Sequence, residues 1–253
     1  MDLNGRVAIV TGGGTGIGRA VCLRLAKSGA KGVVVNYSRS DKDANATAAE
    51  IIGLGADAIA NKADVSNEGE VKAMIASVID RYGRLDVLIN NAGTTRFISH
   101  PDLDALTDQV WDDILNVNLK GTFYCCRAGA PELRKTGGTI VNIASIAGHR
   151  ATGSSIVYAV SKAGVIQLTR ALAVALAPEV RVNSVSPGLV STRWLRQFDA
   201  EAADSQATST TETTPLNAVA GSDHVAQAMM AFVENDMLTG QDVVVDGGKN
   251  ILY

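Results

Sequence analysis

The stretch that decides the fold is VAIVTGGGTGIGRAVCLRLAK, residues 7–27. Its first five residues are apolar or β-branched and predict a buried strand, and its last nine have the periodicity of a helix. Between them, Gly12, Gly16 and Gly18 have the spacing G-x-x-x-G-x-G. Glycines let the backbone turn sharply and approach a ligand closely, and the helix that follows directs free N–H groups at the same place. The stretch therefore predicts a phosphate cradle between a strand and a helix.

Short β-branched runs alternate with longer segments of helical period along the rest of the chain. Several of these runs are continuously apolar, as expected for strands that are covered on both faces. The alternation predicts one α/β domain over residues 1–253, with a parallel sheet and helices on both of its faces. The expected strands are Val7–Thr11, Gly32–Asn36, Ala58–Lys62, Val87–Asn90, Thr139–Ala144, Val180–Val185 and Asp242–Val245.

The composition excludes several classes of protein. A formal net charge of -3 gives no basic surface for nucleic acid or an anionic membrane. We see no signal peptide and no apolar run of the ~18–20 residues that span a bilayer, so we expect a cytoplasmic protein. The three cysteines have neither metal nor disulfide spacing and are expected to be buried and reduced. The three histidines are far apart in the sequence, and no metal is expected.

The residues after the second expected strand bear on the choice of cofactor. Enzymes that bind NAD often carry an acidic residue there, which holds the adenosine 2′-hydroxyl. This chain has Tyr37, Ser38 and Arg39 instead, and its next acids, Asp41 and Asp43, are expected to open a helix. The guanidinium of Arg39 suits a 2′-phosphate, with Ser38 as a second donor. The sequence therefore favours NADP(H), with NAD(H) as the alternative.

A second set of residues has the chemistry of an acid–base catalyst. Tyr158 and Lys162 are four residues apart on an expected helix, so their side chains share a face. A tyrosine has an ordinary pKa of ~10, and a nearby ammonium lowers the pKa of such a group by ~1–3 units. Ser145 directly follows an expected strand, and ligands of open α/β sheets bind beyond the carboxyl ends of the strands. We expect Ser145 and Tyr158 to reach the same crevice as the glycine turn.

These features resemble the short-chain dehydrogenases/reductases, over essentially the whole chain. The branch that it resembles contains single-domain enzymes such as 3-oxoacyl reductases and glucose dehydrogenases. The resemblance implies a Rossmann-type, doubly wound parallel sheet of seven strands in the order 3-2-1-4-5-6-7. It also implies a homo-oligomer, a dimer or tetramer. The matching motifs are Thr11-Gly12-x-x-x-Gly16-x-Gly18, Asp64-Val65, Asn90-Asn91-Ala92-Gly93, Asn116-Val117-Asn118-Leu119, Ser145, Tyr158-x-x-x-Lys162 and Pro187-Gly188.

The resemblance implies an oxidoreductase that moves a hydride between NADP(H) and a carbonyl or secondary alcohol. Tyr158 would exchange a proton with the substrate oxygen, and Ser145 would hydrogen-bond that oxygen. Lys162 would lower the pKa of Tyr158 and hold the nicotinamide ribose, and Asn118 would hold a water that links Lys162 to solvent. The residues expected at the cofactor are Gly12, Thr15, Gly16, Ile17, Gly18, Tyr37, Ser38, Arg39, Asp64, Val65, Asn91, Ala92, Gly93, Tyr158, Lys162, Pro187, Gly188, Val190 and Thr192.

Residues 189–222 break the rhythm of strands and helices, and we expect them to form a lid over the substrate pocket. The segment is rich in Ser, Thr and Ala, and Ser205–Thr214 has the composition of a loop or mobile segment. Long irregular segments in compact domains are often functional. By position, Arg96, Phe97, Ser154, Ser155, Ile156, Trp194 and Phe198 either line the pocket or pack locally, and His149 and Arg150 either contact substrate or lie in a turn.

Two departures from the family pattern bear on cofactor and substrate. Thr15 stands where many NADP-using relatives have Arg or Lys, which weakens the preference for NADP(H). Basic residues typical of carrier-protein reductases are missing at Thr136 and Glu179, although Lys135 and Arg181 are close. The substrate stays open among a 3-oxoacyl thioester, a sugar or polyol, a cyclic ketone and a steroid-like alcohol.

Two other functions are compatible with the fold. A catalytically silent protein that binds or senses NADP(H) is disfavoured because all four expected catalytic residues are present. An epimerase or dehydratase on the same scaffold is disfavoured because such relatives are usually longer, with a larger substrate domain.

Overall fold

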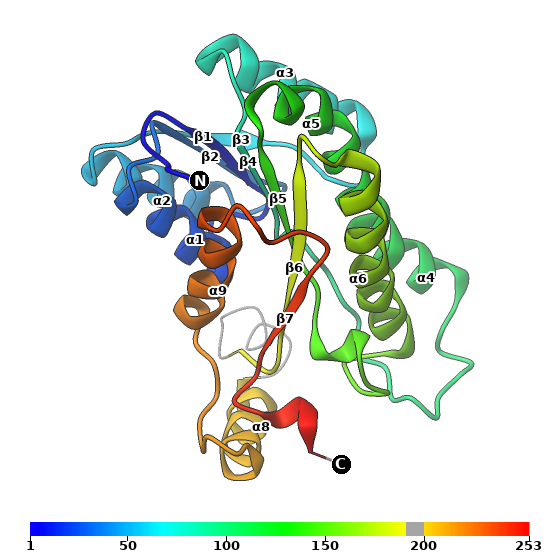
Figure 1. Ribbon diagram of the computed structural model, residues 1–253. Helices are drawn as coiled ribbons and strands as arrows, with labels where there is room; N and C mark the ends of the chain where they lie inside the picture. Colours follow the sequence, from blue (N-terminus) through cyan, green and yellow to red (C-terminus); the bar gives the residue numbers. More distant parts are fainter. Residues whose placement is uncertain (191–199, 253) are drawn as a thin grey trace.

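Seven parallel strands form one sheet in the order β3-β2-β1-β4-β5-β6-β7 within residues 1–190 and 200–252, the part of the chain that this computed structural model describes (Figure 1). This confirms the expected strand order. The strand order reverses between the neighbouring strands β1 and β4. Ligands of doubly wound sheets bind at this topological switch point. The strands are β1 (Val7–Val10), β2 (Gly32–Tyr37), β3 (Asp57–Lys62), β4 (Val87–Asn90), β5 (Thr139–Ile143), β6 (Arg181–Pro187) and β7 (Asp242–Val245).

Helices cover both faces of the sheet. They are α1 (Gly16–Lys27), α2 (Asp41–Gly53), α3 (Glu68–Tyr82), α4 (Asp108–Leu115), α5 (Thr122–Thr136), α6 (Ile156–Leu176), α8 (Ala200–Thr213) and α9 (Ser222–Glu234). The described residues also form three short helical turns: η1 (Asn116–Gly121, a π-helix), η2 (Ile146–Gly148) and η3 (Lys249–Ile251). Asp41 and Asp43 lie in the first turn of α2, as expected from the helix dipole.

Alternate residues of each strand face opposite layers of helices. In β1, Ala8 and Val10 pack in the core that contains α1, α2 and α9, whereas Val7 and Ile9 pack with α3, α5 and α6. Figure 1 shows α1 and α9 on one side of the sheet and α3, α5 and α6 on the other. This period of two explains why the strands read as continuously apolar runs.

The segment Ser205–Thr214 is not a loop, so that expectation is wrong. Residues 200–213 form α8, and the hydroxyls of Thr211 and Thr213 donate to the carbonyl oxygens of Ala207 and Ser209, one turn earlier. Such bonds satisfy Thr hydroxyls without unwinding the helix, and the alanines in the first half of α8 are strong helix formers. The helix ends shortly before Pro215, whose ring disfavours a helical conformation in the residue before it.

The core confirms the expectation for the cysteines. Cys22, Cys125 and Cys126 are buried and free of disulfides. Burial raises the pKa of Cys126 to about 12 and raises the pKa values of the other two thiols, so all three remain protonated. They act as small apolar side chains rather than as nucleophiles.

Helix α6 is long and apolar enough, by length and composition, to cross a membrane. In the fold it lies against the sheet and α5, and Val165, Ala173 and Leu176 are buried there. Its polar residues Ser161, Lys162 and Thr169 are also buried, each with a hydrogen-bond partner. Its apolar composition therefore matches its position in the core.

Candidate active site

The turn between β1 and α1 is packed so tightly that two of its positions require glycine. A Cβ on Gly18 would lie 2.3 Å from the carbonyl oxygen of Gly12, and Gly12 itself has a φ of 60°. The side-chain amide of Asn91, just after β4, donates to the carbonyl oxygens of Thr11 and Gly12 at 2.9 and 3.1 Å. No side chain caps the first turn of α1, so its N–H groups stay available to an anion.

A cleft of about 980 Å³ connects this turn to the carboxyl ends of β4, β5 and β6. It brings together most of the residues that the sequence placed at the cofactor and the catalytic centre. Those on its wall are Gly12, Thr15, Gly16, Ile17, Asn91, Ala92, Gly93, Ser145, Tyr158, Lys162, Pro187, Gly188 and Val190. Thr192, Trp194 and Phe198 lie outside the described residues.

Ser145 and Tyr158 form the polar centre of the cleft. Ser145 begins η2, where its hydroxyl accepts a hydrogen bond from the N–H of Ala147 at 3.2 Å. Burial raises the pKa of Tyr158, and a hydrogen bond with Ser145 partly offsets that rise. Tyr158 lies in the first turn of α6. The N-cap residue Ser155 accepts a hydrogen bond from the N–H of Tyr158 at 3.2 Å. The two hydroxyls thus meet although they come from different elements.

Lys162 lies one turn after Tyr158 but is bound elsewhere. Its ammonium donates to the carbonyl oxygen of Ile143 at 2.9 Å and lies 5.7 Å from the centre of the Tyr158 ring. Burial lowers the pKa of Lys162 to about 8. The expected lowering of the Tyr158 pKa by this ammonium is not seen, because burial raises that pKa and the one lowering cause is the hydrogen bond with Ser145.

Asn118 braces the loop after β4. It lies in the π turn η1, and its side-chain oxygen accepts from the N–H of Thr94 at 2.8 Å. Its side-chain nitrogen donates to the carbonyl oxygen of Thr94 and to the hydroxyl of Ser161, both at 3.0 Å. A Cβ on Gly93 would lie 3.4 Å from this amide oxygen and 3.8 Å from the nitrogen of Lys162. Asn118 therefore fixes the loop beside Lys162, and its expected water relay stays a prediction.

The residues expected at the adenine end lie outside the wall of the cleft. Ser38 and Arg39 are exposed after β2, and the Tyr37 hydroxyl donates to a carboxylate oxygen of Asp41 at 2.6 Å. After β3, Asp64 accepts hydrogen bonds from the backbone and side chain of Ser66. These residues stand at the carboxyl ends of β2 and β3, which lie on one side of β1, where a dinucleotide would extend from the glycine turn.

His149 and Arg150 do not line the cleft, so the structure does not place them at the substrate. His149 bonds a carboxylate oxygen of Asp242 at 2.8 Å, and Arg150 donates to the carbonyl oxygen of Lys249 at 2.7 Å. They fasten the loop that carries Ser145 to β7 and to the segment after it. Of the other expected pocket residues, Phe97 and Ser154 line the cleft, whereas Arg96, Ser155 and Ile156 do not.

Sequence reasoning missed six polar residues on the described cleft wall, among them His100, Thr210 and Lys249. A usable signal existed for Lys249, because it follows the carboxyl end of the last strand, where ligands of such sheets bind. His100 lies in a long loop and Thr210 in α8, and no sequence pattern places either one. No cluster of metal ligands occurs among the residues that the structure describes.

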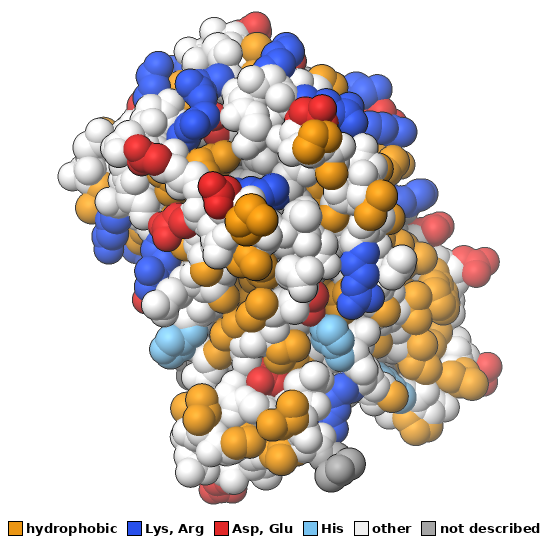
Figure 2. All heavy atoms as spheres, viewed as in Figure 1, with side chains coloured by type: hydrophobic (Ala, Val, Ile, Leu, Met, Phe, Trp, Pro, Cys, Tyr) orange, Lys and Arg blue, Asp and Glu red, His pale blue; other side chains and the backbone are white. Residues whose placement is uncertain are grey.

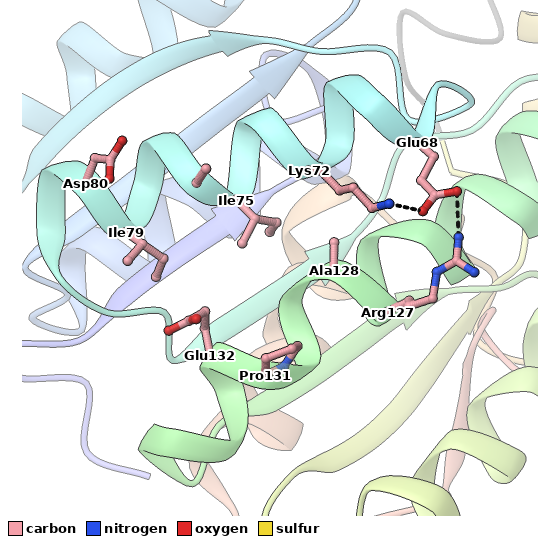
Figure 3. A pocket seen from close by; sticks show the side chains of 10 residues that line it. Glu68, Lys72, Ile75, Ile79, Asp80, Arg127, Ala128, Pro131 and Glu132 are labelled. Carbon is pink, nitrogen blue, oxygen red and sulfur yellow. Dashed lines mark ion pairs between the residues drawn. The ribbon is translucent and has the colours of Figure 1, made fainter.

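A second hollow lies between α3 and α5 (Figure 3). Three of its charged residues bind one another, because Glu68 lies 2.6 Å from Lys72 and 2.7 Å from Arg127. Arg127 also lies over the ring of Phe123. Ser145, Tyr158 and Lys162 line the cleft at the carboxyl ends of the strands and do not line this hollow.

Residues 6–203 match the family model described as short chain dehydrogenase. The chain belongs to this family. It is 44% identical, over 97% of its length and 96% of the relative, to a Streptomyces violaceoruber protein named as ketoacyl reductase 2 of the granaticin polyketide synthase. It is 39% identical, over 95% and 96% of the two chains, to the 3-oxoacyl-[acyl-carrier-protein] reductase FabG of Staphylococcus aureus.

Solved structures agree with this membership. The crystal structure of levodione reductase matches with a TM-score of 0.90 and 30% identity, covering 99% of this chain and 100% of that one. The protein is thus an oxidoreductase of the short-chain dehydrogenase type with a 3-oxoacyl-reductase-like sequence.

Proposed function

We propose that the protein reduces a ketone with NADPH, using Tyr158 as general acid, and catalyses the reverse reaction with Tyr158 as general base. The observation that carries this proposal is the single cleft that joins the glycine turn to Ser145, Tyr158 and Lys162. The relatives named for 3-oxoacyl reduction make 3-oxoacyl thioesters the first substrate class to test.

The cradle fits a dinucleotide. A Cβ on Gly18 would fill the turn, and the uncapped N–H groups at the start of α1 suit a pyrophosphate. Lys162 would hold the hydroxyls of the nicotinamide ribose, and the backbone from Pro187 to Val190 would border the nicotinamide. When bound, NADPH supplies the hydride that is added to the carbonyl carbon.

The protein supplies position and a proton. Ser145 would donate a hydrogen bond to the substrate oxygen as negative charge develops there. The O–H bond of Tyr158 then breaks, and its proton forms the new hydroxyl of the product. With ligand in place, an ammonium at Lys162 would favour the resulting phenolate and so lower the pKa of Tyr158. Asn118 would keep the neighbouring loop fixed during this transfer.

The test is an assay of NADPH consumption with a 3-oxoacyl thioester, a cyclic ketone, an oxidised sugar and a steroid ketone. The proposal expects turnover of at least one of them, and the best substrate identifies the class. Tight binding of NADPH without turnover of any ketone would instead support a silent, NADP(H)-binding protein.

The choice of NADP(H) depends on Arg39. Replacing Arg39 with alanine is expected to raise the KM for NADPH about tenfold, because a hydrogen bond to a charged group contributes about 1.5–3 kcal/mol. The KM for NADH should not change, since NADH lacks the 2′-phosphate. Steady-state kinetics with both cofactors measures this, with the exposed Lys31 replaced by alanine as the control. Equal effects on both cofactors would refute the role of Arg39.

We further propose a cytoplasmic homo-oligomer, a tetramer as the first expectation. Figure 2 shows hydrophobic side chains gathered on the side of the molecule where α4 and α6 lie, whereas charges of both signs are mixed elsewhere on this face. On α6, Val174 is 82% exposed and Val160 is 45% exposed, which is unusual for a helix that faces only water. Light scattering of the purified protein measures the oligomeric state.

A further inference from the structure

Lys249 lines the catalytic cleft, but the proposed reaction gives it no role. It begins η3, just after β7, where Gly247 and Gly248 with φ values of 69° and 90° turn the chain back. The N–H of Gly248 donates to the Asp246 carboxylate at 2.8 Å, and Arg150 donates to the carbonyl oxygen of Lys249 at 2.7 Å. The backbone that presents this lysine is therefore held from two sides.

The ammonium of Lys249 has one bond to a neutral partner. It donates to the hydroxyl of Thr213, at the end of α8, at 2.7 Å. Across residues 1–190 and 200–252, no described carboxylate forms an ion pair with it. An ammonium has three donors, so two of them remain for a ligand. Thr213 thus orients the positive charge without neutralising it.

The charge of the cleft has one sign. The residues described on its wall include Lys162 and Lys249 but neither Asp nor Glu. Lys162 is buried and bonded to the carbonyl oxygen of Ile143, beside the catalytic tyrosine. Lys249 is therefore the cation of the described wall that is left for another ligand. An ion pair is stronger in such a partly enclosed, weakly polar space than in bulk water.

The rest of the substrate part of the cleft is mostly apolar. Phe97, Ile98, Ile146 and Leu189 contribute to it. One further polar group belongs to a residue of the cleft wall: the Nε2 of His100 is buried and has no hydrogen-bond partner in the described structure. Buried polar groups are normally satisfied, so this atom points to a polar substituent of a ligand.

We propose that Lys249 binds an anionic group of the substrate, a carboxylate or a phosphate, while the ketone lies at Ser145 and Tyr158. Lys249 is then the specificity-determining residue, and the favoured substrates are oxo compounds with a negative charge separated from the ketone by an apolar spacer. The spacer is apolar in the simplest case, and a longer arm with amide groups, such as that of pantetheine, is the other case to test. This inference rests on the proposed ketone reduction and adds a substrate class to it.

Two matched substrate pairs test the inference and separate the two kinds of anion. The carboxylate pair is the monomethyl and the dimethyl ester of a 3-oxo dicarboxylic acid. The phosphate pair is the 3-oxobutanoyl thioester of 4′-phosphopantetheine and that of pantetheine. Within each pair the two members share the reacting ketone and differ in charge. The values of kcat/KM with NADPH are measured for wild type and for four variants: Lys249→Met, Lys249→Arg, Thr213→Val and the distant control Lys31→Met.

Wild type is expected to prefer the charged member of at least one pair by about tenfold, as for one hydrogen bond to a charged group. Lys249→Met should abolish this preference through the KM of the charged member and leave the neutral member unchanged. Lys249→Arg and Thr213→Val should keep the preference, because both retain a cation, and Lys31→Met should have no effect. Added KCl should weaken the preference by screening. The preferred pair identifies the anion.

Three results would overturn the inference. One is equal kcat/KM within both pairs for wild type, with the ketones still reduced, which would leave the proposed function intact. Another is a preference that persists in Lys249→Met. A third is a preference lost in Thr213→Val as fully as in Lys249→Met, which would assign Lys249 to anchoring α8. If no ketone is reduced at all, the proposed function and this inference both fail.

Discussion

Replacing Tyr158 with phenylalanine is expected to lower kcat for ketone reduction by about 10²- to 10⁴-fold, the usual contribution of a positioned general acid. The phenol is the proton donor, and its ring would still fill the same space beside Ser145. Binding of NADPH should be nearly unchanged, because the cradle is formed by the glycine turn and α1. Stopped-flow and steady-state assays measure the rate, and cofactor fluorescence measures binding.

A matched control is the replacement of Tyr124 by phenylalanine. Tyr124 lies on α5 and packs against the core that contains α3, α5 and α6. It does not line the cleft. This variant should keep the wild-type kcat, which would show that loss of any tyrosine hydroxyl is not enough. Wild-type turnover in a folded Tyr158→Phe protein would exclude Tyr158 as the acid.

Replacing Asp86 with alanine is expected to destabilise the fold by about 1–3 kcal/mol, because it leaves the buried N–H of Val7 without its acceptor and removes the carboxylate that binds two partly exposed arginines. The Asp86 side chain is fully buried and binds Arg6 at 2.8 Å and Arg84 at 2.6 Å. It also accepts from the N–H of Val7 at 2.9 Å, at the start of β1. Urea unfolding of both proteins measures the change. The exposed pair of Asp57 and Arg81 is the control, and its removal should cost less than about 1 kcal/mol.

The effect of Asp86 should depend on pH. Burial by itself raises the pKa of Asp86, but hydrogen bonds from Arg84, Val7 and Arg6 outweigh it, so the pKa lies below its ordinary value of 3.8. A lowered carboxyl pKa stabilises the folded state above the unfolded value, and this stability is lost as the pH falls through the folded value. The difference between wild type and Asp86→Ala should therefore shrink in acid. A difference that grows in acid would contradict this account.

The sheet was predictable because each strand is marked by the apolar pattern of its own few residues. Runs such as Val7–Val10 and Val87–Asn90 are apolar on both faces and are separated by helical segments, which implies a parallel sheet. The glycine turn was predictable for the same reason, since Gly12 and Gly18 fill places where a side chain would collide. The position of Ser145 and Tyr158 on one cleft then followed from the rule that ligands bind beyond the carboxyl ends of strands.

Features that depend on tertiary contacts were not predictable. Composition also misled at a local feature, because α8 reads as a loop although its threonine hydroxyls bond within the helix, as Thr211 does to Ala207. The π turn at Asn118 depends on a bond to Thr94, which is distant in the sequence. Lys249 was missed because the path of the chain after β7 is set by Arg150 and by contacts with α8.

The state of Lys162 shows the limit of reasoning from spacing alone. The separation of four residues correctly places its side chain on the face of α6 that carries Tyr158. Spacing does not reveal that the ammonium binds the carbonyl oxygen of Ile143, or that burial lowers its pKa to about 8. The proposed lowering of the Tyr158 pKa by this ammonium therefore has to be measured on the complex with the cofactor.

The central claim, that one phenol carries the proton in both directions, is tested most directly by the pH dependence of kcat/KM for the forward and reverse reactions. Ketone reduction requires protonated Tyr158, so its rate should fall as the pH rises through the pKa of the phenol. Alcohol oxidation requires the phenolate, so its rate should rise through the same value, and both transitions should vanish in Tyr158→Phe. Profiles that share no transition, or transitions that persist without the phenol, would contradict the account.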